Sequence, residues 1–232
     1  MSDTTLLEFA RGPALTWAVS IFVAGVLWRL VGVLLLRTKK DLSEPRNAAT
    51  WKGLRLIALR SWPRREFLGG TAFGEVMGYT FHVGFLVALF FLVPHVLFFE
   101  SVFEGLLGFD FSDVFGFAWP TLPTGVITFL SAVSLAALVA VLIHRLTNPV
   151  KRLISNFDDY LSWFLTVAPL ATGMLAYAHA GGARYETLLA VHILAVQALM
   201  IWFPFGKLMH AFTIFAARGA QGMIFERKGA SL

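Results

Sequence analysis

Long uncharged apolar stretches alternate along the chain with short polar segments that carry most of the charge. A helix needs about 20 apolar residues to cross the ~30 Å hydrocarbon core of a bilayer. Five stretches reach that length, so the sequence predicts an all-α integral membrane bundle of five transmembrane helices. The predicted spans cover residues 14–36, 78–99, 125–143, 160–180 and 188–212.

The composition agrees with a membrane protein and excludes several protein classes and cysteine-dependent cofactors. Of the 232 residues, 57% are apolar and 14% are charged, whereas soluble domains run nearer 45–50% and about 25%. A soluble enzyme, a disordered tail, a collagen-like repeat and a disulfide scaffold are excluded. The chain has no cysteine, so it cannot itself ligate an iron–sulfur cluster, attach a c-type haem or use thiol catalysis. Any redox role must use another cofactor.

The basic residues are distributed unevenly between the two ends of the predicted spans. Of 19 lysines and arginines, sixteen fall on one side, Arg11 and Arg184 fall on the other, and Arg29 lies inside the first span. Because cytoplasmic loops are enriched in lysine and arginine, we predict an N-terminus outside and a C-terminus in the cytoplasm. The loop of residues 100–122 has no basic residue but contains four acids.

Residues 50–60, in the first cytoplasmic loop, can form an amphipathic helix at the cytoplasmic interface. Two interpretations are open: an anchor to anionic membrane lipid, or a docking surface for a cytoplasmic partner. The net charge of +5 arises from the sidedness of the loops, so we predict no nucleic-acid partner.

All six histidines lie in a span or at its edge, where an ionisable group is costly and usually functional. The alternating topology places His82 near the cytoplasmic end of the second span and His95 near its outer end. The fifth span runs the opposite way, with His192 outside and His210 inside. Two levels of paired imidazoles are what bis-histidine ligation of two b-type haems requires. We therefore predict an inner iron held by His82 and His210, and an outer iron held by His95 and His192.

Helix geometry supports this arrangement on one helix and leaves it open on the other. The eighteen steps between the fifth-span histidines return to the same face and rise roughly 27 Å, with Pro204 as a plausible kink. The thirteen steps between the second-span histidines rise roughly 20 Å but turn through about 220°. Pro94 can change that rotation.

Other residues compete for these roles. His144 is an alternative inner ligand and His179 an alternative outer ligand, since both lie at span ends. Arg29 either reaches the interface with its charged group or pairs with a propionate of the inner haem. No span interior contains a carboxylate, which disfavours a zinc-type transport site.

Several segments resemble one family of membrane cytochromes b. The stretches 192–194 (HIL) and 202–210 (WFPFGKLMH) are similar to the last helix of the gamma subunit of respiratory nitrate reductase. They equally resemble the related subunits of heterodisulfide-reductase-like and dissimilatory-sulfite-reductase-linked complexes. Residues 152–159, the pair Thr172-Gly173 and residues 11–13 (RGP) add to the likeness. One departure is the thirteen-residue interval on the second helix, which is shorter in nitrate reductase gamma subunits.

The resemblance implies a single cytochrome b-type membrane domain over residues 1–232, with two b-type haems and ligands on the second and fifth helices. It implies quinol oxidation near the outer haem and electron transfer to an iron–sulfur partner subunit on the cytoplasmic face. The catalytic site for the terminal substrate would lie on another subunit. The expected location is the cytoplasmic membrane of a bacterium or archaeon. Glu100 and Glu104 are candidates either for proton release or for a purely structural role.

Two other hypotheses remain at this stage. The chain can be a haem-free, quinone-binding anchor subunit whose histidines are structural. It can also be a transporter of a metal or small solute.

Overall fold

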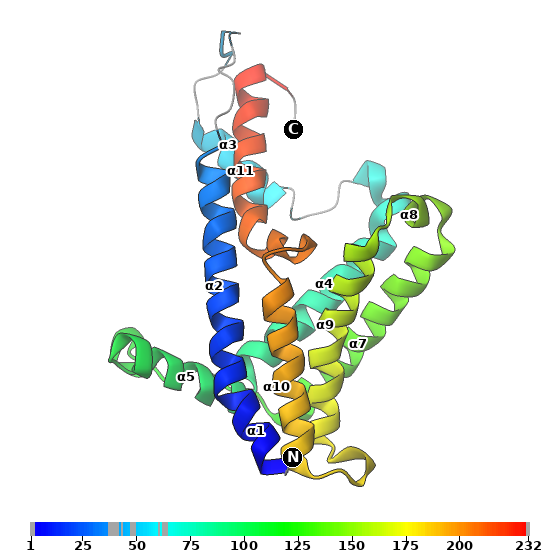
Figure 1. Cartoon of the computed structure of the whole chain (residues 1–232). Coiled ribbons are helices and arrows are strands. Elements are labelled where there is room, and N and C mark those ends of the chain that lie inside the picture. The colour runs from blue at the N-terminus through cyan, green and yellow to red at the C-terminus, as the bar shows by residue number, and fades with distance from the viewer. Residues whose placement is uncertain are drawn as a thin grey trace. The chain divides into compact units, whose positions relative to one another are not determined.

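The computed structural model describes residues 3–36, 42, 44–46, 50–59, 61 and 65–230. Within these residues every regular element is a helix (Figure 1). Five helices are long and apolar enough to cross a membrane, which confirms the predicted class of multi-pass, all-α protein. These five candidate spans are Thr5–Leu34, Leu68–Phe91, Thr124–Thr147, Phe157–Tyr177 and Tyr185–Trp202.

The predicted end of the second span is wrong, because the helix breaks before His95. Helix α4 (Leu68–Phe91) ends at Phe91, Leu92 adopts an extended conformation (φ −79°, ψ 127°), and α5 (Val93–Leu107) begins at once. Pro94 lies in the first turn of α5. A proline is tolerated there because its missing N–H is not needed, whereas inside a continuing α4 it would clash with the preceding turn.

The predicted fifth span is also interrupted. Helix α10 (Tyr185–Trp202) ends just before Pro204, a short 3₁₀ turn η3 (Lys207–Met209) follows, and α11 (His210–Lys228) starts a new helix. His192 and His210 therefore lie on separate helices, and the inference that they share one face of a continuous helix is wrong. Pro204 ends the helix rather than kinking it.

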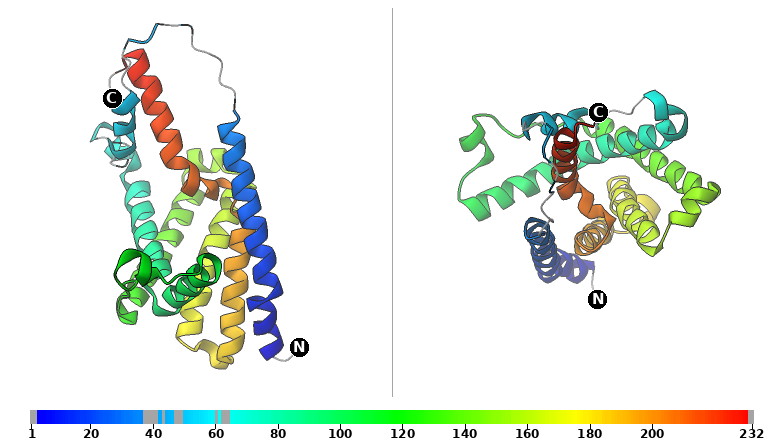
Figure 2. Two further views of the ribbon diagram at one scale, coloured as in Figure 1. Left: turned by 90° about the vertical axis from the view of Figure 1, so that its left-hand side faces the viewer. Right: turned by 90° about the horizontal axis from the view of Figure 1, so that it is seen from above.

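The chain divides into two compact units, and α9 (Phe157–Tyr177) and α10 contribute residues to both. The first unit contains α1 (Asp3–Arg11), α2 (Pro13–Leu34), α3 (Thr50–Leu59), η1 (Arg65–Phe67) and α11. The second contains most of α4, then α5, α6 (Phe111–Phe115), α7 (Thr124–Thr147), α8 (Pro149–Ile154) and η2 (Ala180–Gly182). Figure 2 gives two further views of these elements.

In the first unit, the predicted amphipathic segment is the helix α3, and it packs along α11. Glycines allow the close approach, since a Cβ on Gly222 would overlap the Gly53 carbonyl and lie 2.8 Å from the Leu56 Cβ. Leu56 is buried, whereas Trp51 is exposed. Part of the apolar surface of α3 thus covers α11. Arg60, at the end of the predicted segment, lies outside the described residues, as do the loop residues Arg37, Lys39, Lys40 and Arg64.

In the second unit, α4 and α7 meet at Gly84. The Ser134 side chain is fully buried there, and its hydroxyl donates to the Phe81 carbonyl (3.4 Å). A Cβ at position 84 would overlap the Ser134 Oγ and lie 2.7 Å from the Leu130 carbonyl oxygen. The backbones of α4 and α7 therefore need a residue without a side chain at this crossing.

We predict that Gly84→Ala destabilises the protein by about 1–3 kcal/mol, the usual cost of overpacking a core. The measurement is the midpoint of thermal unfolding in a fixed detergent. Gly78→Ala is the matched control on the same helix, because a Cβ there meets nothing within 4 Å among the described residues. Equal effects of the two substitutions would contradict the close crossing of α4 and α7.

Candidate functional site

The second unit brings two of the predicted site histidines together. The rings of His95, on α5, and His192, on α10, have centroids 6.1 Å apart and planes inclined by only 13°. Both residues belong to this unit, and both side chains are partly buried. The proposed outer pair is thus a pair of neighbouring rings.

The break after α4 places an acceptor beside His95. The Nδ1 atom of His95 lies 2.9 Å from the carbonyl oxygen of Ala88, in the last turn of α4. A continuous helix would carry His95 seven residues, or nearly two turns, beyond Ala88. The backbone break at Leu92 is therefore what lets the ring reach back to this carbonyl.

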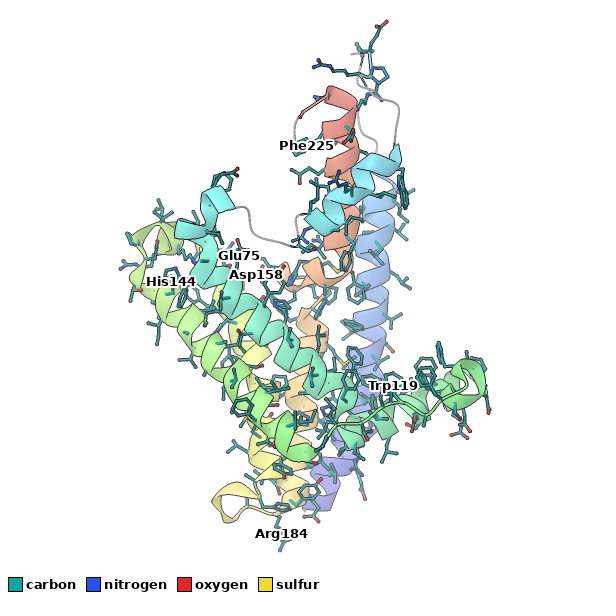
Figure 3. The ribbon with its side chains drawn as sticks, turned by 180° about the vertical axis from the view of Figure 1, so that it is seen from behind. Glu75, Trp119, His144, Asp158, Arg184 and Phe225 are labelled. Atoms are coloured by element: carbon teal, nitrogen blue, oxygen red, sulfur yellow. The ribbon has the colours of Figure 1, made fainter. Side chains whose placement is uncertain are left out.

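The same break leaves two carbonyls of α4 without their usual helical donors. Pro94 has no N–H for the Phe90 carbonyl, and the His95 N–H goes to Leu92 instead of Phe91 (2.9 Å). The segment that returns from α6 supplies both missing donors. The Trp119 Nε1–H donates to Phe90 (2.8 Å), and the next hydrogen bond runs from the Leu122 N–H to Phe91 (3.0 Å). Trp119 is labelled in Figure 3.

His192 is oriented by the second half of α9. Its Nδ1 lies 3.0 Å from the carbonyl oxygen of Pro169 and 3.4 Å from the Thr172 Oγ1. A Cβ on Gly173 would come within 3.0 Å of the His192 Cε1. The absence of a side chain at Gly173 thus lets the imidazole lie against α9.

The two rings share one arrangement of their nitrogens. In each, Nδ1 faces a backbone carbonyl, which favours the tautomer that carries its proton on Nδ1 and leaves the Nε2 lone pair to bind a metal. An imidazole nitrogen binds a metal at about 2 Å, and the ring centre lies about 1.1 Å further away. Two rings on opposite sides of one metal ion are therefore separated by roughly 6 Å. The observed 6.1 Å fits that value.

The predicted inner ligands lie in different units. His82, on α4, has its Nδ1 2.6 Å from the Gly78 carbonyl and belongs to the second unit. His210, the first residue of α11, has its Nδ1 2.8 Å from the Lys207 carbonyl and belongs to the first unit. Each ring is thus held by a carbonyl of its own chain segment. Their pairing stays a prediction.

The remaining candidates have local surroundings. The ring of His144 packs on Phe73 (4.6 Å between centroids), and that of His179 stacks on Tyr185 (5.2 Å). His144 is labelled in Figure 3. Arg29 has an exposed side chain on α2, so its proposed pairing with a propionate stays a prediction. No cluster of three or more metal-ligating side chains was found among the residues that the structure describes.

A polar cluster that the sequence did not indicate fixes the turn after α10. One oxygen of the Asp158 carboxylate accepts from the Ser162 hydroxyl (2.7 Å) and the Trp202 indole (3.3 Å), and the other accepts from the Lys207 N–H (3.0 Å). A Cβ on Gly206 would lie 2.7 Å from this carboxylate. Asp158, labelled in Figure 3, therefore ties the start of α9 to the turn that precedes His210.

Sequence reasoning also missed the residues that orient the two neighbouring histidines. Pro94 was a usable signal, because a proline after an apolar run marks a possible helix end. The Trp119 indole donates to the Phe90 carbonyl at the end of α4, and the two residues lie 29 positions apart in the sequence. No local pattern connects the two.

Comparison with known proteins gives one extended likeness. The chain is 28% identical over 234 residues to a protein of Nitratidesulfovibrio vulgaris strain Hildenborough, and the alignment covers 96% of this chain and 95% of that protein. No family model matches the chain, and no solved structure matches it. The likeness thus extends over nearly the full length of both chains.

We predict that Asp158→Ala lowers the midpoint of thermal unfolding clearly more than Lys207→Ala. The first change removes an acceptor of three hydrogen bonds, and bonds to charged groups contribute about 1.5–3 kcal/mol each. The second removes an ion pair with Asp159 and a long hydrogen bond to the Asn156 Oδ1 (3.4 Å), and the lysine side chain is 51% exposed. The Asp159 side chain is only 8% exposed, but it still accepts from the Asn156 N–H (3.0 Å) after the substitution. Pairs with a solvent-exposed lysine contribute about 1 kcal/mol or less, and the backbone N–H of residue 207 is retained. A loss with Lys207→Ala as large as that with Asp158→Ala would contradict the dominant role of the carboxylate.

Proposed function

We propose that this chain is a di-haem b subunit that transfers electrons between the quinone pool and an iron–sulfur or catalytic partner on the cytoplasmic face. The observation that carries the proposal is the pair of rings formed by His95 and His192. The two ring centroids lie 6.1 Å apart and each Nδ1 faces a backbone carbonyl, so these two histidines would hold one haem through their Nε2 atoms.

The proposed task of His95 and His192 is to hold and orient one haem. His95 and His192 would present Nε2 from α5 and α10, with the Ala88 and Pro169 carbonyls fixing the ring orientation. A hydrogen bond from Nδ1–H to a carbonyl also makes the ligating nitrogen more basic. A bound b-type haem supplies reversible one-electron chemistry at this place.

The second haem of the proposal rests on the sequence. His82 and His210 are the proposed inner ligands, and Arg29 is the proposed partner of a propionate there. Electron transfer across a membrane needs a redox group near each side of the bilayer. The two levels of histidines would hold one haem at each side. The paired ring geometry supports the outer level.

The proposed direction across the membrane rests on charge. Sixteen of the 19 basic residues fall on the side assigned to the cytoplasm, which supports an outside N-terminus and a basic cytoplasmic surface facing the partner. Quinol oxidation would take place near the outer haem, and the absence of cysteine is consistent with clusters held by another subunit. The proposed location is the cytoplasmic membrane of a bacterium or archaeon.

The haem content of the purified protein tests the proposal directly. We expect a pyridine haemochrome assay to find about two b-type haems per chain. A preparation of correctly folded protein without haem would favour the haem-free anchor. Uptake of a metal or solute by the chain alone in liposomes would favour the transporter.

Substitutions assign the ligands. His95→Ala and His192→Ala should each remove the same component of the reduced-minus-oxidised spectrum, because the two side chains would ligate one iron. His82→Ala and His210→Ala should each remove the other component. His179→Ala is the matched control, since this exposed histidine in the same unit stacks on Tyr185, and it should leave both components. Loss of different components with His95→Ala and His192→Ala would refute the outer pair.

A further inference from the structure

Two side chains from beyond the break at Leu92 bind carbonyls in the last turn of α4. The His95 Nδ1 lies 2.9 Å from the Ala88 oxygen, and the Trp119 Nε1–H donates to the Phe90 oxygen (2.8 Å). His95 comes from α5, and Trp119 comes from the segment between α6 and α7. One imidazole and one indole therefore divide neighbouring acceptors of the same helical turn between them.

The Phe90 carbonyl depends on the indole because of the proline four residues further along the chain. Pro94 has no N–H, so the regular helical donor to Phe90 is missing. A backbone oxygen is a strong acceptor, and an unpaired one draws a donor within reach. The imidazole Nδ1–H of His95, held two residues away at Ala88, is such a donor. The indole N–H thus removes a competing acceptor and keeps the imidazole at Ala88.

Aromatic contacts hold the Trp119 indole in the place from which it donates. Its ring stacks on Phe99 (5.8 Å between centroids, planes at 13°) and also contacts Phe103 (6.0 Å) and Phe111 (4.6 Å). Pro120 follows it in the chain and disfavours a helical backbone at the preceding residue. The position of the donor is thus fixed by α5, α6 and the local chain together.

We propose that Trp119 is a positioning residue of the His95–His192 pair, because its indole N–H occupies the Phe90 carbonyl and so fixes the His95 ring. The observed geometry of the pair, with centroids 6.1 Å apart and planes inclined by 13°, then depends on a residue outside both helices that carry the histidines. For the haem that the pair would hold, this role rests on the proposed function. For the His95 ring itself, it concerns this chain alone.

Trp119→Phe removes the donor and keeps a flat aromatic ring in the cluster. The expected result is a shift in the low-field g value of the ferric haem component that His95→Ala and His192→Ala each abolish. This g value depends on the angle between the two imidazole planes, so the other haem component should keep its own value. Phe103→Leu is the matched control, since it weakens the same cluster but retains the indole N–H. It should lower the midpoint of thermal unfolding without moving the g value.

A second readout needs no haem and reports on the ring itself. In the full chain with isotope-labelled histidine, the NMR resonance of the His95 Nδ1–H is the one that His95→Ala removes. Trp119→Phe should speed the exchange of this proton with water several-fold, because the ring loses its fixed acceptor. Trp17→Phe makes the same change at an exposed position of α2 (70%) and should leave the exchange rate unchanged.

The outcomes separate the positioning of the ring from the presence of haem. A folded parent chain without haem would refute the proposed function, and the exchange of the His95 proton would still decide the role of Trp119. Two haems in the parent chain, with the g value and the exchange rate both unaltered by Trp119→Phe, would overturn the positioning role and leave the proposed function standing. An equal g shift with Phe103→Leu would also overturn it, because loss of packing alone would then explain the effect.

Discussion

The constraint on which the candidate site depends is the hydrogen-bonding need of backbone carbonyls at the end of α4. Inside the hydrocarbon core of a bilayer no water is at hand to satisfy them, and each unpaired group costs several kcal/mol. Pro94 removes one donor, and the backbone break at Leu92 redirects another, the His95 N–H. Trp119 and Leu122 replace both donors, and the His95 ring takes a carbonyl of the same turn. The break after α4, the orientation of the His95 ring and the return of the chain at Trp119 therefore satisfy the carbonyls of α4 together.

How far the sequence predicts this protein depends on the range of the interaction involved. Five apolar stretches of span length appear as five candidate spans, because hydropathy over 20 residues outweighs local detail. The helix ends near His95 and His210 were not predicted, since hydropathy is the same on either side of a backbone break. The pairing of His95 with His192 followed from topology alone, whereas the carbonyls that orient them did not. The contact of His192 with Pro169, like the one between Trp119 and Phe90, joins residues more than 20 positions apart, and the contact of His95 with Ala88 depends on the break between them.

Three prolines lie close to candidate histidines of the site. Pro94 begins the helix of His95, Pro169 provides the carbonyl beside His192, and Pro204 lies in the turn before His210. Irregular backbone at membrane depth is tolerated where the surrounding protein satisfies it. Here the compensation comes from indole, imidazole and carboxylate groups, including the Asp158 carboxylate on the turn after α10. The Trp119 indole, the His95 imidazole and the Asp158 carboxylate thus each pair with a backbone group.

Holding His95 and His192 by main-chain carbonyls has an evolutionary consequence. A carbonyl is present whichever amino acid occupies the position, so substitution at Ala88 leaves the acceptor in place as long as the helix ends where it does. The geometry of the paired rings therefore does not depend on which side chains neighbour these carbonyls, provided that the histidines and the backbone break at Leu92 are kept. A lineage of such proteins can lose most of its sequence identity and still inherit the same pair of rings.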